Sequence, residues 1–213
     1  MTAAKAPRAL GRPATQAGSS TRSGTGPSDT ALVVAARAGE AWAQQAIYER
    51  YARMVNSLAW RLMPGDAEVE DLVQDAFVQA LDHLQRLKEP AALSSWLGSI
   101  VIRQAHKRLR RKRLRIKLGL LRSEPIDPET VVDTGAPLEA AAELRAVYSV
   151  LQELPAEERI ALVLRRVEGL ELNEIAERMG LSLATVKRRV VAAEKVLARV
   201  FAAPGTDEPG GGP

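Results

Sequence analysis

The chain has 213 residues and no cysteine, which excludes disulfides and thiolate metal sites and permits a reducing, cytoplasmic setting. Aromatic residues make up only 4% while hydrophobic residues make up 46%, so the core has to consist of aliphatic side chains, a composition that favours helices over sheets. The net charge of +4 is by itself only a weak indication of a nucleic-acid partner.

Both ends of the chain are predicted to be disordered tails. Residues 1–28 and 204–213 are rich in Gly, Pro and small residues and have almost no large apolar side chains that could offset the entropy of ordering. No apolar run is long enough to span a membrane, and the basic residues near the N-terminus precede no apolar segment of the kind a secretory signal needs. We therefore expect no membrane insertion.

Residues 29–113 have a helical pattern and are predicted to form a first domain. Apolar residues recur at steps of three and four over residues 47–62, and Pro and Gly end that helix. Asp66 is a candidate cap for a second helix, whose apolar stripe ends before Pro90. Ser94 or Ser95 then starts a third helix that continues into a basic block.

Opposite charges are separated along the chain. Ten Lys and Arg residues and no acidic residue lie between Arg103 and Arg122, whereas acids gather over residues 66–75 and 124–133. A cationic and an anionic surface on one chain suggest two kinds of partner. Residues 114–138 combine Gly and Pro with acids and are predicted to be a flexible linker to a second helical domain at residues 139–203. The expected fold class is all-α, with two small helical domains.

A helix-turn-helix is predicted at Leu172–Arg199 in the second domain. Ala176 is small where two helices cross closely, Gly180 suits a left-handed turn, and the Ser182 hydroxyl can cap the second helix. An ordinary helical hairpin with a solvated basic surface is the alternative, but these features occur together in register and favour DNA binding. The residues expected to contact DNA are Ser182, Ala184, Thr185, Lys187, Arg188 and Arg189.

Three segments resemble the extracytoplasmic-function group of bacterial RNA polymerase sigma factors. LQELPAEERIALVLRRVEGLELNEIAERMGLSLATVKRR resembles their region 4, EDLVQDAFVQAL at residues 70–81 is similar to the region 2 helix that docks on the polymerase clamp, and SSWLGSIVIRQAHKRLRRKR at residues 94–113 resembles the helix that opens the minus-10 element. The resemblance covers residues 29–113 and 139–202. It implies a sigma factor whose partners are core RNA polymerase and promoter DNA, with an anti-sigma factor as a further possible partner.

The resemblance also implies roles for individual residues. Trp96 corresponds to a core tryptophan, and the loop Lys88–Ser95 to the place where the family captures a flipped base, although this loop has no aromatic residue. The polymerase-binding residues are then Asp71, Gln74, Asp75 and Phe77. The minus-10 residues are Arg103, Lys107, Arg108, Arg110 and Arg111, with non-specific phosphate neutralisation as the alternative from Arg111 onward.

The chain departs from the family pattern in two places. The recognition helix has Val191, Ala192 and Glu194 where the family often has His and Arg, which limits the expected DNA contacts to residues 182–189. The third helix lacks the usual Ala-Arg-Asn and has Val101-Ile102-Arg103 instead.

Three other kinds of protein are alternatives to a sigma factor. A stand-alone DNA-binding regulator would not need the acidic helix at residues 70–81, and an RNA-binding adaptor would use the basic block alone. An enzyme with an appended DNA-binding domain would need a convergent polar constellation, and the sequence contains no Gly-rich phosphate loop, metal cluster or nucleophile–base pair. We therefore expect no enzymatic activity, no cofactor and no metal.

Overall fold

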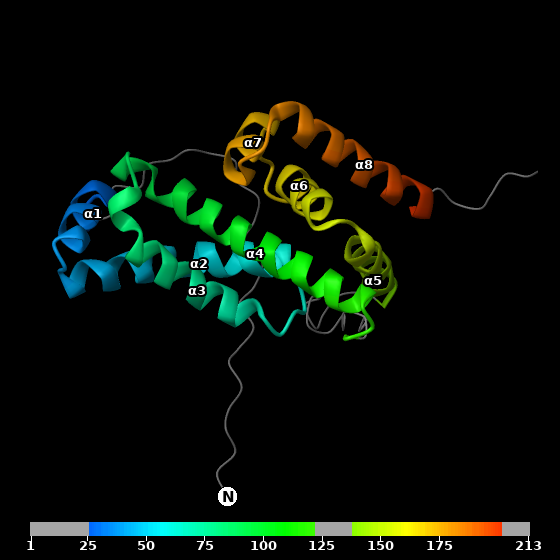
Figure 1. Ribbon diagram of the computed structural model, residues 1–213, viewed down its shortest axis with the longest axis horizontal. Coiled ribbons are helices and arrows are strands. Elements are labelled where there is room, and N and C mark those ends of the chain that lie inside the picture. Colours follow the sequence, from blue (N-terminus) through cyan, green and yellow to red (C-terminus); the bar gives the residue numbers. More distant parts are fainter. Residues whose placement is uncertain (1–25, 122–137, 202–213) are drawn as a thin grey trace, which may run out of the picture.

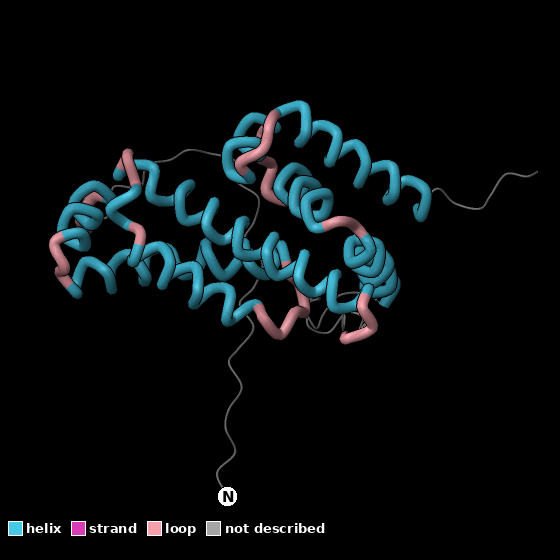
Figure 2. The backbone as a smooth tube through the Cα atoms, viewed as in Figure 1, coloured by secondary structure: helices cyan, strands magenta, loops and turns pink. Residues whose placement is uncertain are grey.

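The computed structural model describes residues 26–121 and 138–201, and within these two stretches every long element is a helix (Figures 1 and 2). The all-α prediction is therefore confirmed. The predicted tails fall almost wholly outside the described residues, as does most of the predicted linker. No helix in the described part of the chain combines the length and apolar character needed to cross a membrane.

The first helical unit consists of four α-helices and two short 3-10 turns. These elements are α1 (Asp29–Arg37), α2 (Ala41–Leu62), α3 (Val69–Asp82), η1 (Leu84–Arg86), η2 (Pro90–Ala92) and α4 (Leu93–Lys117). Ser28 caps α1 by accepting a hydrogen bond from the Ala31 amide at 3.2 Å. Helix α4 starts one residue before Ser94 and continues to Lys117, past the predicted domain end at residue 113.

Asp66 does not cap α3 as the sequence predicted. Glu68 occupies the N-cap position without a side-chain hydrogen bond, and Asp66 instead accepts a hydrogen bond from the Glu68 amide at 2.9 Å, in the turn that precedes the helix. The other Asp66 oxygen pairs with Lys112 of α4 at 2.7 Å. Asp66 therefore ties the α2–α3 loop to α4.

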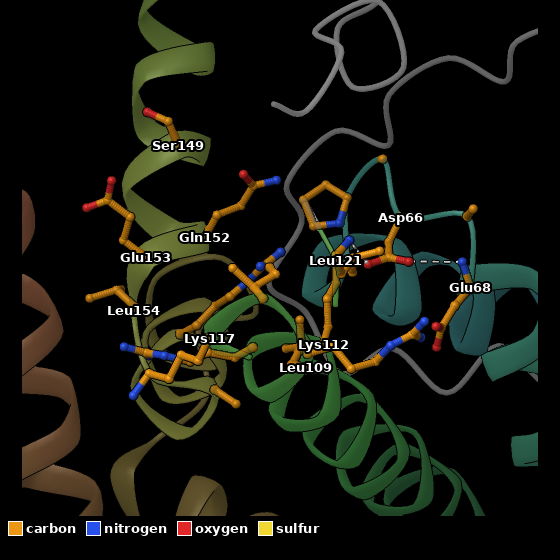
Figure 3. Close-up of a pocket in the computed structure, with 18 residues that line it drawn as sticks. Asp66, Glu68, Leu109, Lys112, Lys117, Leu121, Ser149, Gln152, Glu153 and Leu154 are labelled. Atoms are coloured by element: carbon orange, nitrogen blue, oxygen red, sulfur yellow. Dashed lines mark hydrogen bonds and ion pairs between the residues drawn. The ribbon is translucent and has the colours of Figure 1, made fainter. Parts of the chain in front are cut away.

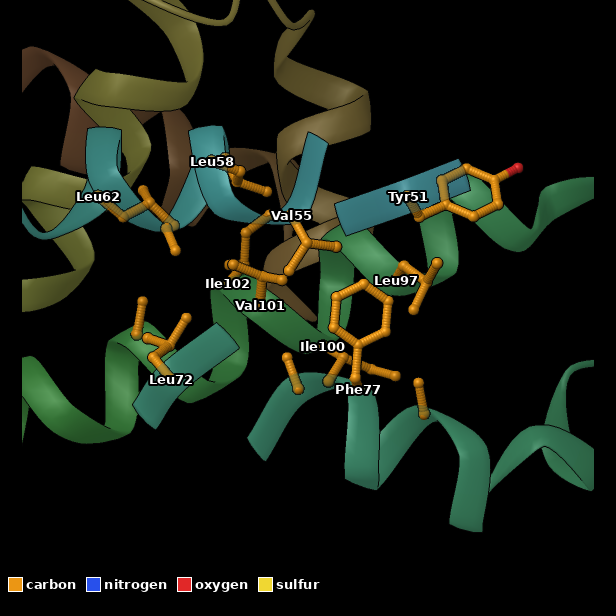
Figure 4. Packing of buried hydrophobic residues seen from close by; sticks show 14 of the residues in the cluster. Tyr51, Val55, Leu58, Leu62, Leu72, Phe77, Leu97, Ile100, Val101 and Ile102 are labelled. Carbon is orange, nitrogen blue, oxygen red and sulfur yellow. The ribbon is translucent and has the colours of Figure 1, made fainter. Parts of the chain in front are cut away.

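The core of this unit lies between α2, α3 and α4. Figure 4 shows Val55 and Leu58 of α2, Phe77 of α3 and Leu97 and Ile102 of α4 pointing toward one another. Of the predicted apolar positions Ile47, Tyr51, Met54, Leu58 and Leu62, four are buried and Met54 is half-buried, while the neighbouring Val55 is buried in addition. Burial of this aliphatic set supplies the main stabilisation of the bundle.

The second unit contains α5 (Leu138–Glu153), α6 (Ala156–Arg166), α7 (Leu172–Met179) and α8 (Leu183–Phe201). Pro155 precedes α6, and Glu157 and Glu158 lie in its first turn, where their charge complements the helix dipole. Helix α6 ends at Arg166, before the predicted stop at Gly169, which has a φ of +70° in the following turn.

The two units share one continuous apolar core cluster. Ile160 and Leu164 of α6 and Ile175 of α7 belong to the same cluster as the core of α2 and α4 (Figure 1). Arg61 of α2 also forms a bidentate ion pair with Glu168, and one of its two bonds measures 3.1 Å. The helices α6 and α7 are thus packed along α4, an arrangement that the sequence pattern did not predict.

Candidate nucleic-acid interface

The turn between α7 and α8 has the predicted helix-turn-helix geometry. Gly180 has φ +66° and ψ 34°, a left-handed conformation that only glycine adopts without steric cost. The Leu181 amide donates to the Ala176 carbonyl at 2.9 Å, which closes the end of α7. Ser182 then accepts a hydrogen bond from the Thr185 amide at 3.2 Å, so its predicted capping role is confirmed.

One face of α8 is buried and the opposite face carries the predicted DNA contacts. Val186 and Val190 are buried in the main core cluster together with residues of α6 and α7, and Ala193 is buried in a second cluster with residues of α5 and α6. On the other face, Ser182, Ala184, Lys187 and Arg188 are exposed, and Thr185 is half-buried. Among the described residues, no carboxylate lies within ion-pair distance of Lys187 or Arg188, so both charges face solvent.

Arg189 differs from its two basic neighbours. It pairs with Glu157 at 2.7 Å and with Glu158 at 3.3 Å, both in the first turn of α6. Glu194, one of the departures from the family pattern, also binds α6, because Arg166 donates to it at 2.9 Å. These two positions therefore help to hold α8 on α6.

The basic helix α4 contains exposed and internally paired cations. Arg103, Lys107, Arg110 and Arg111 are exposed, and none of them has an ion pair within the described residues. The Arg108 side chain, in contrast, is only 12% exposed and contacts two carboxylates of the α3 segment, Glu68 at 3.0 Å and Asp75. The ion pair between Arg108 and Asp75 thus joins a residue predicted to contact the minus-10 element to a residue predicted to bind polymerase.

The acidic helix α3 presents three of its four predicted polymerase contacts to solvent. Asp71, Gln74 and Asp75 are exposed, whereas Phe77 is only 5% exposed and belongs to the core. The Tyr48 ring of α2 packs on Phe77 with a centroid separation of 4.8 Å, and 47% of Tyr48 is exposed. Tyr48 is not among the residues predicted from the sequence, because it lies on α2 and away from the motif that carried the prediction.

The loop before α4 is anchored at its start. Arg37 of α1 donates to the Leu84 carbonyl at 3.2 and 3.1 Å and also to the Leu87 carbonyl. Beyond this anchor, Lys88 and Glu89 are exposed. Trp96 is half-buried against the core cluster, which confirms its predicted packing role.

Known proteins similar to this chain cover both units. The sigma-70 region 2 family matches residues 47–115 and the sigma-70 region 4 family matches residues 144–197. The chain is 32% identical over 174 residues to the ECF RNA polymerase sigma factor SigM of Mycobacterium tuberculosis, covering 82% of this chain and 85% of that protein. It is 29% identical over 178 residues to the ECF RNA polymerase sigma-E factor of Escherichia coli K12, covering 79% and 92% of the two chains.

A solved structure confirms the fold. The sigma factor RpoE of Bartonella quintana, solved in complex with the anti-sigma factor NepR, superimposes with a TM-score of 0.58 at 21% identity, covering 76% of this chain and 98% of that one. Both units, in the same order along the chain, are thus matched by sequence and by fold, and the chain belongs to the ECF group of RNA polymerase sigma factors.

Proposed function

We propose that this sigma factor divides its work among three surfaces, on α8, α4 and α3. Family membership gives the overall function, which is to bind core RNA polymerase and direct it to specific promoters. Sigma factors regulate transcription and are not catalysts in themselves, so no catalytic residue is assigned. We place its action in the cytoplasm, together with the polymerase.

The first surface is the start of α8, which we assign to the minus-35 element. The observation that carries this assignment is the exposure of Lys187 and Arg188, with no carboxylate partner among the described residues, at the N-terminal turns of a helix whose other face is buried. Cations in this position release counterions from DNA phosphates and can reach base edges in the major groove. Ser182, Ala184 and Thr185 lie in the same turns and complete the surface.

The second surface is the exposed face of α4, which we assign to DNA around the minus-10 element. Arg103, Lys107, Arg110 and Arg111 supply its positive charge. Arg108 lies on the same helix, but its guanidinium is held by Glu68 and Asp75. We therefore assign Arg108 to positioning α4 against α3 rather than to direct contact with DNA.

The third surface is the acidic-polar face of α3, which we assign to core polymerase. Asp71 and Gln74 provide exposed acceptors that can pair with basic residues of a partner, and Asp75 keeps one oxygen for such a partner beside its contact with Arg108. Phe77 supports this face from the core, and the exposed Tyr48 ring packed on it extends the surface with apolar area. An anti-sigma factor is a further partner we expect, since the sigma factor of Bartonella quintana was solved in complex with one.

Two charge-reversal variants of the full chain test this division. The double variant Lys187→Glu, Arg188→Glu should weaken binding to a minus-35 duplex by about two orders of magnitude while leaving core-polymerase binding unchanged, because it reverses charges only on α8. Asp71→Arg should weaken core-polymerase binding and leave duplex binding unchanged. Lys195→Glu, an exposed change further along α8, is the matched control for both measurements.

Each result has a defined meaning. If the α8 double variant loses polymerase binding as strongly as DNA binding, the assignment of separate surfaces is wrong. Normal assembly of Asp71→Arg with core polymerase would remove α3 as the polymerase surface. A chain that binds the duplex but not core polymerase at all would support a stand-alone regulator, and preference for RNA over the duplex would support an RNA-binding adaptor.

A further inference from the structure

A cavity of about 680 Å³ lies where the end of α4 meets the α2–α3 loop and the α5–α6 turn (Figure 3). Figure 3 shows Lys112 and Lys117 along the lower part of the view, Asp66 and Glu68 at the right, and Gln152 and Leu154 at the left. Five cationic side chains line it, namely Lys112, Arg113, Arg115, Lys117 and Arg159. None of these residues belongs to the surfaces assigned above to DNA or to polymerase.

The cavity has more positive than negative charge available to a ligand. Three acids also line it, Asp66, Glu68 and Glu153. Two of them are already engaged, since Asp66 pairs with Lys112 at 2.7 Å and Glu68 pairs with Arg108 at 3.0 Å. Glu153 is exposed. Lys112 is thus paired, whereas within the described residues no ion pair joins a carboxylate to the other four cavity cations, Arg113, Arg115, Lys117 and Arg159.

Arg159 is the most buried of the five cationic side chains that line the cavity. It lines the cavity, is only 6% exposed, and its Nε has no hydrogen-bond partner among the described residues. Burial lowers the pKa of Arg159 to about 10, partly opposed by the negative charge of Asp66, so the guanidinium remains charged near neutral pH. A buried cation without a paired anion is costly, and an anion in the cavity would remove that cost.

Asp66 forms no ion pair with Arg159. One of its oxygens accepts from the Glu68 amide at 2.9 Å and the other pairs with Lys112 at 2.7 Å. Arg113 adds a second unsatisfied donor, because its buried Nη1 also lacks a partner in the part of the chain that the structure describes. Both arginines line the cavity, and a guanidinium group is suited to phosphate oxygens, which it can bind in a bidentate manner.

The size and walls of the cavity indicate an organic ligand. Its volume falls in the usual range for small-molecule sites and far exceeds that of inorganic phosphate. Leu109, Ile116 and Leu154 form apolar parts of its wall. We propose that this cavity binds a small organic phosphate of nucleotide size, with Arg159 and Arg113 on its phosphates and the leucine and isoleucine side chains against its organic part.

Such a ligand would contact both helical units at once. Leu109 to Lys117 belong to α4 in the first unit, whereas Leu154 and Arg159 belong to the α5–α6 segment of the second. A molecule bound between them stabilises the arrangement in which they are packed together. The cavity is therefore a place where a metabolite can bias the relative position of the two promoter-binding units.

Isothermal titration of the full chain with ATP, ADP and inorganic pyrophosphate tests the proposal. We expect saturable binding of ATP or ADP, tighter than that of pyrophosphate. Arg159→Gln should weaken this binding by about tenfold or more, since hydrogen bonds to charged groups are the strong ones. Lys117→Glu changes an exposed residue of the cavity wall and should weaken it several-fold, whereas Lys195→Glu on α8, away from the cavity, should leave it within about twofold.

Several outcomes would overturn the proposal. Absence of saturable nucleotide binding by the unaltered chain rejects the site. Pyrophosphate binding without nucleotide binding rejects the organic ligand. Binding that Lys117→Glu leaves intact but Lys187→Glu weakens places the anion on the DNA surface instead, and this comparison decides the question even if Arg159→Gln fails to fold.

Discussion

The helices α4 and α8 both carry dense runs of Lys and Arg, but they use these charges differently. Among the described residues of α8, Arg189 pairs with Glu157 and Glu158 of α6, whereas Lys187 and Arg188 form no ion pair and face solvent. On α4 two cations, Arg108 and Lys112, are tied to the acidic segment around α3, and Arg103, Lys107, Arg110 and Arg111 are exposed.

The difference comes from the acids that each helix packs beside. Residues 66–75 place several carboxylates next to α4, whereas the first turn of α6 brings only Glu157 and Glu158 near α8. A basic run in a sequence can therefore contain both cations that pair within the protein and cations that remain available to DNA. The acids on the neighbouring helix decide which cation has which role. Four substitutions, taken from the largest expected effect to the smallest, test this separation.

The first compares Arg108 with Arg110 on the same helix. Arg108→Ala should lower the free energy of unfolding by roughly 1–2 kcal/mol, because the Arg108 side chain is only 12% exposed and its removal takes away both its packing and its bonds to Glu68 and Asp75. Arg110→Ala, at an exposed position, should change it by less than about 0.5 kcal/mol. Urea unfolding followed by circular dichroism measures both. Equal effects would show that Arg108 is an ordinary surface cation.

The second compares Lys187 with Arg189 on α8. Lys187→Ala should weaken binding to a minus-35 duplex roughly fivefold at physiological salt, because one lost phosphate contact removes about 0.9 from the slope of log affinity against log salt. Arg189→Ala should cost less than about twofold, since its charge is already paired with α6. Fluorescence anisotropy at several salt concentrations gives both slopes. A steeper loss for Arg189 would reverse the assignment.

The third concerns the cap that starts α8. Ser182→Ala should lower the free energy of unfolding by about 1 kcal/mol, since it removes the acceptor for the Thr185 amide. Ser182→Asp keeps an acceptor at the same position and should restore most of the stability. Thermal unfolding of the three proteins is the measurement, and an Asp variant as unstable as the Ala variant would exclude capping as the cause.

The fourth concerns Tyr51, whose hydroxyl donates to Asp29. Burial and this bond raise the pKa of Tyr51 above its usual value, so its contribution to stability is present below about pH 10 and is lost as the pH rises further. Tyr51→Phe should be less stable by about 0.5–1 kcal/mol near neutral pH. The difference between the two proteins should shrink in alkaline solution, as measured by urea unfolding across pH. A constant difference would contradict the raised pKa.

The local elements could be predicted from the sequence because their signals are local. Apolar spacing over residues 47–62, the glycine at position 180 and the hydroxyl of Ser182 each act within one or two turns, and all three were confirmed. The cap of α3 was predicted at Asp66, two residues before the observed N-cap position at Glu68. The sequence pattern could not show that Asp66 pairs with Lys112, because Lys112 is far along the chain. The pairing of Arg108 with Asp75 and the packing of α6 and α7 on α4 also join segments that are far apart in the sequence, so local patterns could not predict them.

Run-off transcription with core RNA polymerase and the full chain tests the central claim most directly, when start sites are mapped on bacterial promoter DNA. The account predicts discrete transcripts that require this chain, and their loss with the double variant Lys187→Glu, Arg188→Glu but not with Lys195→Glu. Start sites identical to those of core polymerase alone, or unchanged by the double variant, would contradict the assignment of α8 to promoter recognition.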